Sequence, residues 1–109
     1  PEALSEDELV SVHDPDYVAA VRAVSSGEEV PNALGYGLGT SDNPIFPGMH
    51  EAVLGVCGAS VAALEAVASG RARRALNLAG GLHHAHRDRA SGFCLYNDLA
   101  VATERAVRR

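Results

Sequence analysis

The segment that most constrains the fold is the apolar run over residues 49–69, whose apolar side chains recur at helical spacing. One stripe of this predicted helix consists of Val53, Cys57, Val61, Leu64 and Ala68. The other faces are largely alanine, valine and glycine. Because a helix that is apolar on nearly every side is stable only when other elements cover it, we expect residues 49–69 to be buried.

A second apolar run, residues 75–78, lies between a group of arginines and a pair of glycines. Its position after a buried helix and before another helical segment predicts a central strand of a parallel sheet. The order helix–strand–loop–helix is typical of α/β architecture. Since one strand cannot form a sheet alone, we expect the chain to be one piece of a larger domain.

Two short helices are predicted near the amino terminus from their capping residues. Ser5 and Glu8 have the spacing of a capping box, in which each side chain accepts from or reaches toward an unpaired backbone amide. Asp14 is a natural N-cap for a second helix, and Pro15 occupies the first helical position, where its missing N–H is tolerated. Gly27 is expected to end this second helix.

The segment over residues 26–48 is rich in Gly, Pro, Asn and Asp, yet it is too apolar for a plain linker. We expect a folded surface loop that packs on the rest of the protein, because long loops inside compact domains are usually functional. Its apolar side chains are Leu34, Tyr36, Leu38, Ile45 and Phe46. At the other end of the sequence, Asn97 and Asp98 are predicted to cap a final helix over residues 99–107.

The composition limits the class of protein. A chain of 109 residues with 47% apolar residues has the content of a small packed domain. Its two cysteines, Cys57 and Cys94, form no CxxC pair, which argues against a disulfide scaffold or a zinc ribbon and favours a reducing, cytoplasmic location. No stretch reaches the roughly 18 uninterrupted apolar residues of a membrane span, so we expect no membrane partner.

The charge is uneven along the chain. Residues 1–69 carry eleven acidic side chains and a single base, whereas residues 70–109 carry eight arginines and three acids. A basic half can indicate nucleic-acid binding, but here the arginines are scattered and no aromatic residues are interleaved for base stacking. We therefore expect two segments of one domain with complementary surface charge and no nucleic-acid partner.

The stretch GGLHHAHRDRASGFCLYND, residues 80–98, follows the predicted strand directly. In open α/β sheets, functional groups gather where strands end in such loops. Gly80 and Gly81 allow a sharp turn, which adjacent imidazoles at His83 and His84 need in order to face the same side. From the residues alone, three roles are open: metal binding, general acid–base catalysis at neutral pH, or ordinary polar loop residues.

The same stretch resembles the signature segment of the zinc-dependent histone deacetylase family, in its microbial branch that includes the acetoin utilization proteins. In that family a GGxHHA run precedes ASGFC and then an N-D pair that opens a helix. The stretches VHDPDYVAAV and YGLGTSDNPIFPG also resemble the family, so the likeness extends from about residue 9 to residue 107. It implies part of a three-layer, parallel-sheet (arginase-like) α/β fold, mostly helical here with one or two strands.

The resemblance also implies roles for individual residues. His83 corresponds to the histidine that polarises the metal-bound water, and His84 to the general acid–base catalyst. Gly92 and Phe93 correspond to a wall of the channel that takes the lysine methylenes. Cys94 and Gly81 are expected near the active site. The implied substrate is an acetylated lysine on a protein, or a small acyl-amine.

The family's metal ligands, an Asp-x-His and a later aspartate, and its oxyanion-stabilising tyrosine have no counterpart in the sequence. We therefore expect residues 1–109 to be a fragment of a single catalytic domain that supplies no zinc ligand. The zinc ligands are expected beyond residue 109, and the isolated chain is expected to be inactive. Two alternatives stay open: a non-catalytic interaction module derived from a deacetylase, and a relative that deacetylates polyamines. The sequence makes no prediction of oligomeric state.

Overall fold

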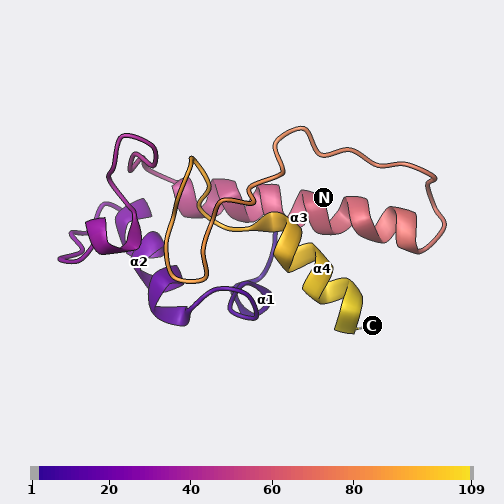
Figure 1. The fold of residues 1–109 in the computed structure, drawn as a ribbon, viewed down its shortest axis with the longest axis horizontal. Helices are drawn as coiled ribbons and strands as arrows, with labels where there is room; N and C mark the ends of the chain where they lie inside the picture. The colour runs from indigo at the N-terminus through magenta and orange to yellow at the C-terminus, as the bar shows by residue number, and fades with distance from the viewer. Residues whose placement is uncertain (1–2, 109) are drawn as a thin grey trace.

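Five helical elements follow one another along residues 3–108, the part of the chain that the computed structural model describes. They are α1 (Glu6–Leu9), α2 (Pro15–Ser25), the 3-10 helix η1 (Leu34–Tyr36), α3 (Met49–Ala68) and α4 (Asp98–Arg108). The molecule is elongated, with principal extents of 46 × 24 × 21 Å. Figure 1 shows that α3 runs along the long axis, and that the segment after it turns back over the same helix before α4 begins.

The helix starts agree with the capping residues in the sequence. The Ser5 hydroxyl accepts a hydrogen bond from the Glu8 amide at 3.4 Å. Ser5 is therefore the N-cap of α1, which begins at Glu6. Asp14 accepts from the Asp16 amide at 3.2 Å, and Pro15 opens α2 as predicted. These side chains satisfy backbone amides that have no partner inside the helix.

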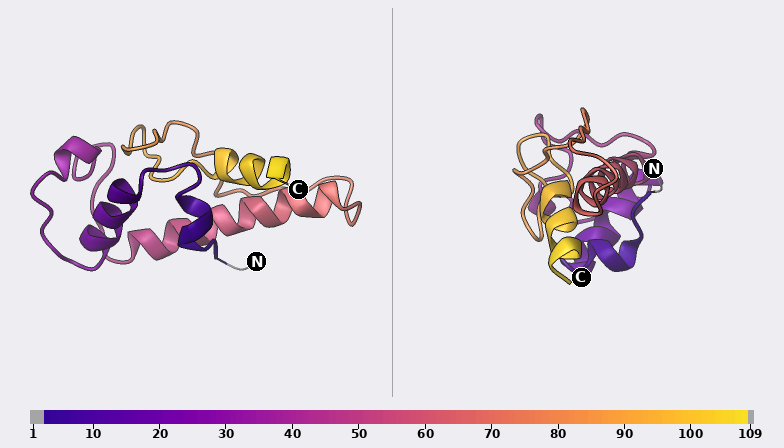
Figure 2. Two further views of the ribbon diagram at one scale, coloured as in Figure 1. Left: turned by 90° about the horizontal axis from the view of Figure 1, so that it is seen from below. Right: turned by 90° about the vertical axis from the view of Figure 1, so that its right-hand side faces the viewer.

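Helix α3 has almost the predicted length but is less buried than predicted. It begins after Gly48, whose φ is 78°, and its buried residues are Met49, His50, Cys57, Gly58, Ser60 and Val61. Leu64 and Val67, on its second half, are exposed. The reason is visible in Figure 2, where α2, α1 and α4 lie along only part of the helix surface. The expectation of a helix covered on every side was therefore wrong for this chain.

By length and composition alone, α3 is apolar enough to cross a membrane. The same property is found in core helices of water-soluble domains, so it is weak support for a membrane span. The helix also carries Glu51 and Glu65, and Glu65 forms an ion pair with Arg105 of α4.

The core is built from aliphatic side chains around a small aromatic group. Tyr17 of α2 and Tyr96 are both fully buried, with ring centroids 6.0 Å apart in an edge-on arrangement. The Tyr17 hydroxyl donates to the Leu95 carbonyl at 2.5 Å, which fixes the end of the histidine-containing segment against α2. His13 and His50 contact the same Tyr96 ring, at centroid distances of 5.4 and 5.8 Å.

The predicted strand over residues 75–78 is not formed. Residues 3–108 contain isolated bridges, His86 with Arg89 and Ser91 with Cys94, but no strand. Leu76 and Leu78 are 81% and 90% exposed. A strand needs backbone hydrogen bonds from neighbouring strands, and none of the described residues supplies them. The expectation of one or two strands, and with it a sheet layer, is thus not met within this part of the fold.

The loop over residues 26–48 is folded, as expected, but only partly packed. Leu38 is fully buried, and η1 forms within the loop. Leu34, Ile45 and Phe46 remain exposed. The Ala90 amide donates to the Tyr36 carbonyl at 2.8 Å, so this loop is tied directly to the histidine-containing segment.

Candidate functional site

The two adjacent histidines lie side by side on the surface. The ring centroids of His83 and His84 are 4.2 Å apart, with 38° between the ring planes. Both residues are exposed. Gly81, two residues before His83, has a φ of 90°, a conformation that glycine adopts without strain. The two imidazoles therefore lie next to each other on a loop that turns at Gly81.

The ring of His83 is oriented by the backbone of its own loop. Its Nδ1 atom lies 3.0 Å from the Gly81 carbonyl oxygen, and its backbone amide donates to the same oxygen at 2.8 Å. A carbonyl can only accept, so Nδ1 carries a proton and donates it to this oxygen. The hydrogen bond fixes the orientation of the His83 ring on the loop.

The loop before the histidines rests on a buried carboxylate. Asp98, the first residue of α4, is fully buried. Its Oδ1 accepts from the Leu82 amide at 2.7 Å, and the Gly81 amide lies 3.1 Å from both carboxylate oxygens. Its Oδ2 also accepts a short hydrogen bond from the Ser60 hydroxyl of α3. One side chain thus joins the loop to two helices.

A second polar residue completes this anchor. The Asn77 side-chain amide donates to the Ser60 hydroxyl at 2.9 Å and to the Val56 carbonyl at 3.0 Å. Gly80 lies so close that a Cβ atom there would come within 2.6 Å of Asp98 Oδ2. Glycine at position 80 is therefore required by the approach of the backbone to Asp98.

Gly92 and Phe93, the predicted channel residues, are in an unusual backbone conformation. Gly92 has a φ of 53° and Phe93 a φ of 68°, the one positive value at a non-glycine residue in residues 3–108. A Cβ atom on Gly92 would lie 3.0 Å from the Cβ and Cγ atoms of His84. Gly92 therefore packs directly on the His84 side chain. The Phe93 ring is 75% exposed.

A cavity of about 330 Å³ adjoins this wall. Phe93 and Leu82 line it together with residues of the 26–48 loop and of α3. His83 and His84 are not among the residues that line this cavity. Both imidazoles are exposed to solvent, beside the wall formed by Gly92 and Phe93.

Cys94 is buried, and its thiol lies 3.4 Å from the Gly92 carbonyl oxygen. Its neighbourhood is fixed by a bridge between Ser91 and Cys94, closed by two backbone hydrogen bonds of 3.1 and 2.8 Å. Cys94 is thus close to Gly92, which contacts His84. The structure brings these predicted site residues into one loop cluster.

His13 is hydrogen-bonded to two residues of the 80–98 segment, Arg87 and Asn97. The Asn97 amide donates to His13 Nε2 at 3.0 Å, so His13 Nδ1 carries the proton and donates to the Arg87 carbonyl at 3.1 Å. Burial lowers the pKa of His13, outweighing the backbone carbonyls that raise it. His13 is therefore a neutral structural link between the loop and the start of α4.

The described residues do not form a metal site of their own. No group of three or more His, Cys, Asp or Glu side chains is arranged to hold an ion within residues 3–108. Zinc usually takes three or four protein ligands, and the side chains described here do not fit it.

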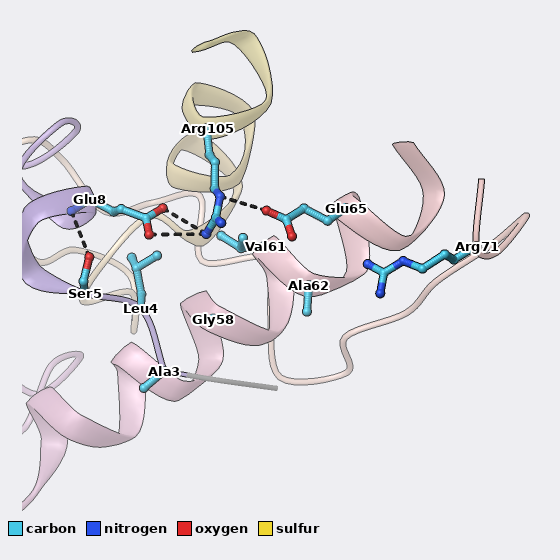
Figure 3. A pocket seen from close by; sticks show the side chains of 10 residues that line it. All are labelled: Ala3, Leu4, Ser5, Glu8, Gly58, Val61, Ala62, Glu65, Arg71 and Arg105. Atoms are coloured by element: carbon cyan, nitrogen blue, oxygen red, sulfur yellow. Dashed lines mark hydrogen bonds and ion pairs between the residues drawn. The ribbon is translucent and has the colours of Figure 1, made fainter. Parts of the chain in front are cut away.

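A further cavity, of about 400 Å³, lies away from the histidines where α1, α3 and α4 meet (Figure 3). Arg105 points into this junction between Glu8 and Glu65, and contacts both carboxylates. Because both acids already pair with Arg105, we assign a structural role to this polar group.

Sequence reasoning missed the residues that support the histidines. It read Asn97 and Asp98 together as the cap of the final helix. Asn97 does cap α4, by accepting from the Ala100 amide at 3.0 Å, whereas the Asp98 carboxylate accepts from the loop amides. Sequence reasoning gave no role to Ser60, Asn77 or His13. Their partners are 17 to 84 positions away in sequence, and no local pattern indicates such contacts. The pair Gly80–Gly81 did indicate that the backbone comes close to another group, and the structure shows that this group is the Asp98 carboxylate.

The family model for the histone deacetylase domain matches residues 1–109. Acetoin utilization protein AcuC of Bacillus subtilis is 51% identical over 106 residues, which cover 95% of this chain and 27% of that protein. Histone deacetylase 8 of Xenopus tropicalis is 39% identical over 103 residues, covering 93% of this chain and 28% of that protein. The chain thus spans about a quarter of the length of the curated relatives it matches.

Solved structures agree with this result. A crystal structure of a histone deacetylase homologue from Aquifex aeolicus matches 98% of this chain and 29% of its own, with 31% identity and a TM-score of 0.87. A histone deacetylase homologue in complex with SAHA matches equally well, with 32% identity and a TM-score of 0.87.

Proposed function

Because the chain belongs to the histone deacetylase family, we propose that it forms part of a deacetylase that hydrolyses the amide of an acetylated lysine, with His83 and His84 as its proton-transfer pair. The observation that carries the proposal is the pair of exposed imidazoles, 4.2 Å apart, on a loop fixed by a buried carboxylate. Proton transfer requires rings that are close to each other, accessible to substrate and held in place.

The proposed step needs one water molecule. The water oxygen forms a bond to the acetyl carbonyl carbon while the water gives a proton to an imidazole. The carbon–nitrogen bond then breaks, and a proton passes from imidazole to the leaving lysine nitrogen. The products are acetate and the free amine. His84 takes the acid–base role and His83, whose ring is oriented by the Gly81 carbonyl, holds the water.

Gly92 and Phe93 are proposed to form one wall of the substrate channel. Their positive φ values bring the Gly92 backbone against His84 and leave the Phe93 ring exposed. An exposed aromatic ring beside the catalytic pair suits the apolar methylenes of a lysine side chain. Cys94, with Gly81, completes the loop cluster as a buried packing residue.

Zinc is proposed as the cofactor of the complete site, with its ligands outside residues 1–109, as the family resemblance implies. The proposed partners are acetylated lysine on a protein or a small acyl-amine, with no nucleic acid and no membrane. A cytoplasmic location is proposed because both cysteines are unpaired and buried.

The test is a chimaera in which this chain replaces the matching 106 residues of the Bacillus subtilis relative. The chimaera and the unmodified relative are assayed side by side for release of acetate from an acetyl-lysine peptide. We expect the chimaera to hydrolyse the peptide. A folded chimaera without hydrolysis, beside an active relative, would contradict the proposed function and favour a non-catalytic module.

A further inference from the structure

We propose that Asp98 is the positioning residue of the histidine pair. This proposal rests on the proposed function of His83 and His84. Its carboxylate is fully buried, yet it carries no ion pair among the contacts of the described residues. Backbone amides and one hydroxyl satisfy it instead. This is an arrangement that fixes a backbone, because each amide has one direction in which to donate.

The bonds to Asp98 come from the two residues that immediately precede His83. The Leu82 amide donates at 2.7 Å and the Gly81 amide at 3.1 Å. The same Gly81–Leu82 peptide group presents its carbonyl oxygen to His83 Nδ1 at 3.0 Å. Asp98 and His83 therefore hold opposite ends of one peptide unit. A shift of the Asp98 carboxylate would move the group that orients the imidazole.

Asp98 does not serve as the cap of its own helix. The Ala100 amide of α4 is taken by the Asn97 side chain. Among the described residues, the hydrogen bonds to the Asp98 carboxylate come from outside α4: from Gly81, Leu82 and Ser60. The helix thus supplies a rigid base, and the side chain is directed at the catalytic loop.

The neighbouring residues are shaped around this contact. Gly80 has no Cβ, which gives the loop room to approach Asp98 Oδ2 and the Ser60 hydroxyl. Asn77 holds the Ser60 hydroxyl from the other side at 2.9 Å. Hydrogen-bond donors surround both oxygens of the Asp98 carboxylate. An asparagine side chain at this position would therefore direct its NH2 group toward another donor. Asp98→Asn therefore breaks the arrangement with almost no change in shape.

The first test measures amide hydrogen exchange by NMR in the 109-residue chain, independently of catalysis. In the wild-type chain we expect the Gly81 and Leu82 amides to be protected although their loop is exposed. In Asp98→Asn their protection should fall about ten- to a hundredfold, the loss that matches a broken charge-assisted hydrogen bond. The matched control is Asn97→Ala, which removes the cap of the same helix and should leave both loop amides protected.

Asp98→Asn is informative only if it folds, which the protection of α3 amides will show. If it does not fold, the wild-type chain still decides: rapid exchange of both loop amides there would overturn the proposal. Ser60→Ala is a second variant, which removes the Ser60 hydroxyl and keeps the hydrogen bonds from the Gly81 and Leu82 amides to Asp98. Both amides should therefore stay protected in it. Loss of Gly81 and Leu82 protection in Asn97→Ala equal to that in Asp98→Asn would also overturn it.

The second test is kinetic and uses the chimaera. Asp98→Asn should lower kcat about a hundredfold with KM almost unchanged, because misplaced catalytic groups impair the reaction and leave substrate contacts intact. An unchanged kcat, or a rise in KM alone, would overturn the positioning role. The two proposals fail separately: an inactive wild-type chimaera contradicts the proposed function, while the exchange experiment still tests Asp98 as the anchor.

Discussion

The histidines of this chain divide into two kinds according to their surroundings. His13 and His50 are buried and bonded to fixed partners, whereas His83, His84 and His86 are exposed. His83 and His84 are also adjacent, with their rings in contact. A buried imidazole with a donor at Nε2 is held neutral, which suits a structural link. An exposed imidazole can exchange protons with water or a substrate, which suits acid–base chemistry.

The buried pair predicts a pH dependence of stability. Burial lowers the pKa of both His13 and His50 from the ordinary value of 6.5. The folded state then binds fewer protons than the unfolded state, so the free energy of unfolding is greatest above pH 6.5 and falls as the pH drops below it. Urea unfolding should show a lower midpoint at about pH 5.5 than at about pH 7.5.

The control for this prediction is His13→Gln, which removes one titrating ring. In that variant the decrease of the midpoint on acidification should be smaller, because Gln does not titrate. A wild-type midpoint that stays constant over this pH range would contradict the neutral, buried state of His13.

Gly92 gives a second prediction at the residue level. Gly92→Ala should cost about 1 kcal/mol of stability, since its φ of 53° is unfavourable for residues with a Cβ. It should also change the NMR resonances of the His84 ring, because the new methyl group would press on it. Gly27→Ala is the matched control: its φ is 90° but nothing lies within 4 Å. Unaltered His84 resonances in Gly92→Ala would contradict the contact.

At the level of elements, Arg105 of α4 joins helices that are distant in sequence. Its guanidinium group contacts Glu8 of α1 at 3.2 Å and Glu65 of α3 at 2.8 Å (Figure 3). All three side chains are partly exposed, so each ion pair is screened by solvent. The value of the cluster is that one side chain fixes the relative positions of three helices.

Arg105→Ala should therefore lower the free energy of unfolding by about 1 kcal/mol, since it removes two ion pairs between elements. Arg108→Ala serves as the control, because within residues 3–108 Arg108 pairs with Glu104 of its own helix, and its side chain is 67% exposed. That change should cost at most about 0.5 kcal/mol. Equal effects of both substitutions in chemical denaturation would contradict the role of Arg105 as a link between helices.

Much of the helical framework could be predicted from sequence, because caps and helix starts depend on neighbouring residues. Ser5, Asp14 and Pro15 act as their types and positions indicated. The strand over residues 75–78 could not be predicted correctly, since a strand depends on partners elsewhere. The role of Asp98 was missed for a related reason: its position beside Asn97 indicated a cap, while its contacts lie 16 to 38 positions away.

At the level of the whole molecule, the apolar surface of the chain is only partly covered. Leu76 and Leu78 are almost fully exposed, and Leu64 and Val67 of α3 are partly exposed. The chain corresponds to about 27% of its Bacillus subtilis relative. In the homologous crystal structures the matched region is likewise under a third of the chain. The proposal that the histidine loop forms one wall of a larger site agrees with this exposed apolar surface.

This view predicts the metal content of the isolated chain. After purification in the presence of zinc and extensive dialysis, the 109-residue chain should retain far less than one equivalent, because no three suitable ligands converge among residues 3–108. Atomic absorption measures the content directly. Stoichiometric zinc, together with deacetylation by the chain alone, would show that this fragment holds a complete site.

The proposed role of His84, moving protons in amide hydrolysis, is tested by kcat of His84→Ala in the chimaera. His86→Ala is the matched control, since His86 is an exposed histidine of the same loop. We expect His84→Ala to lower kcat about 10²- to 10⁴-fold with the zinc content unchanged, and His86→Ala to have little effect. An active His84→Ala chimaera, or one that has lost its metal, would contradict the assignment.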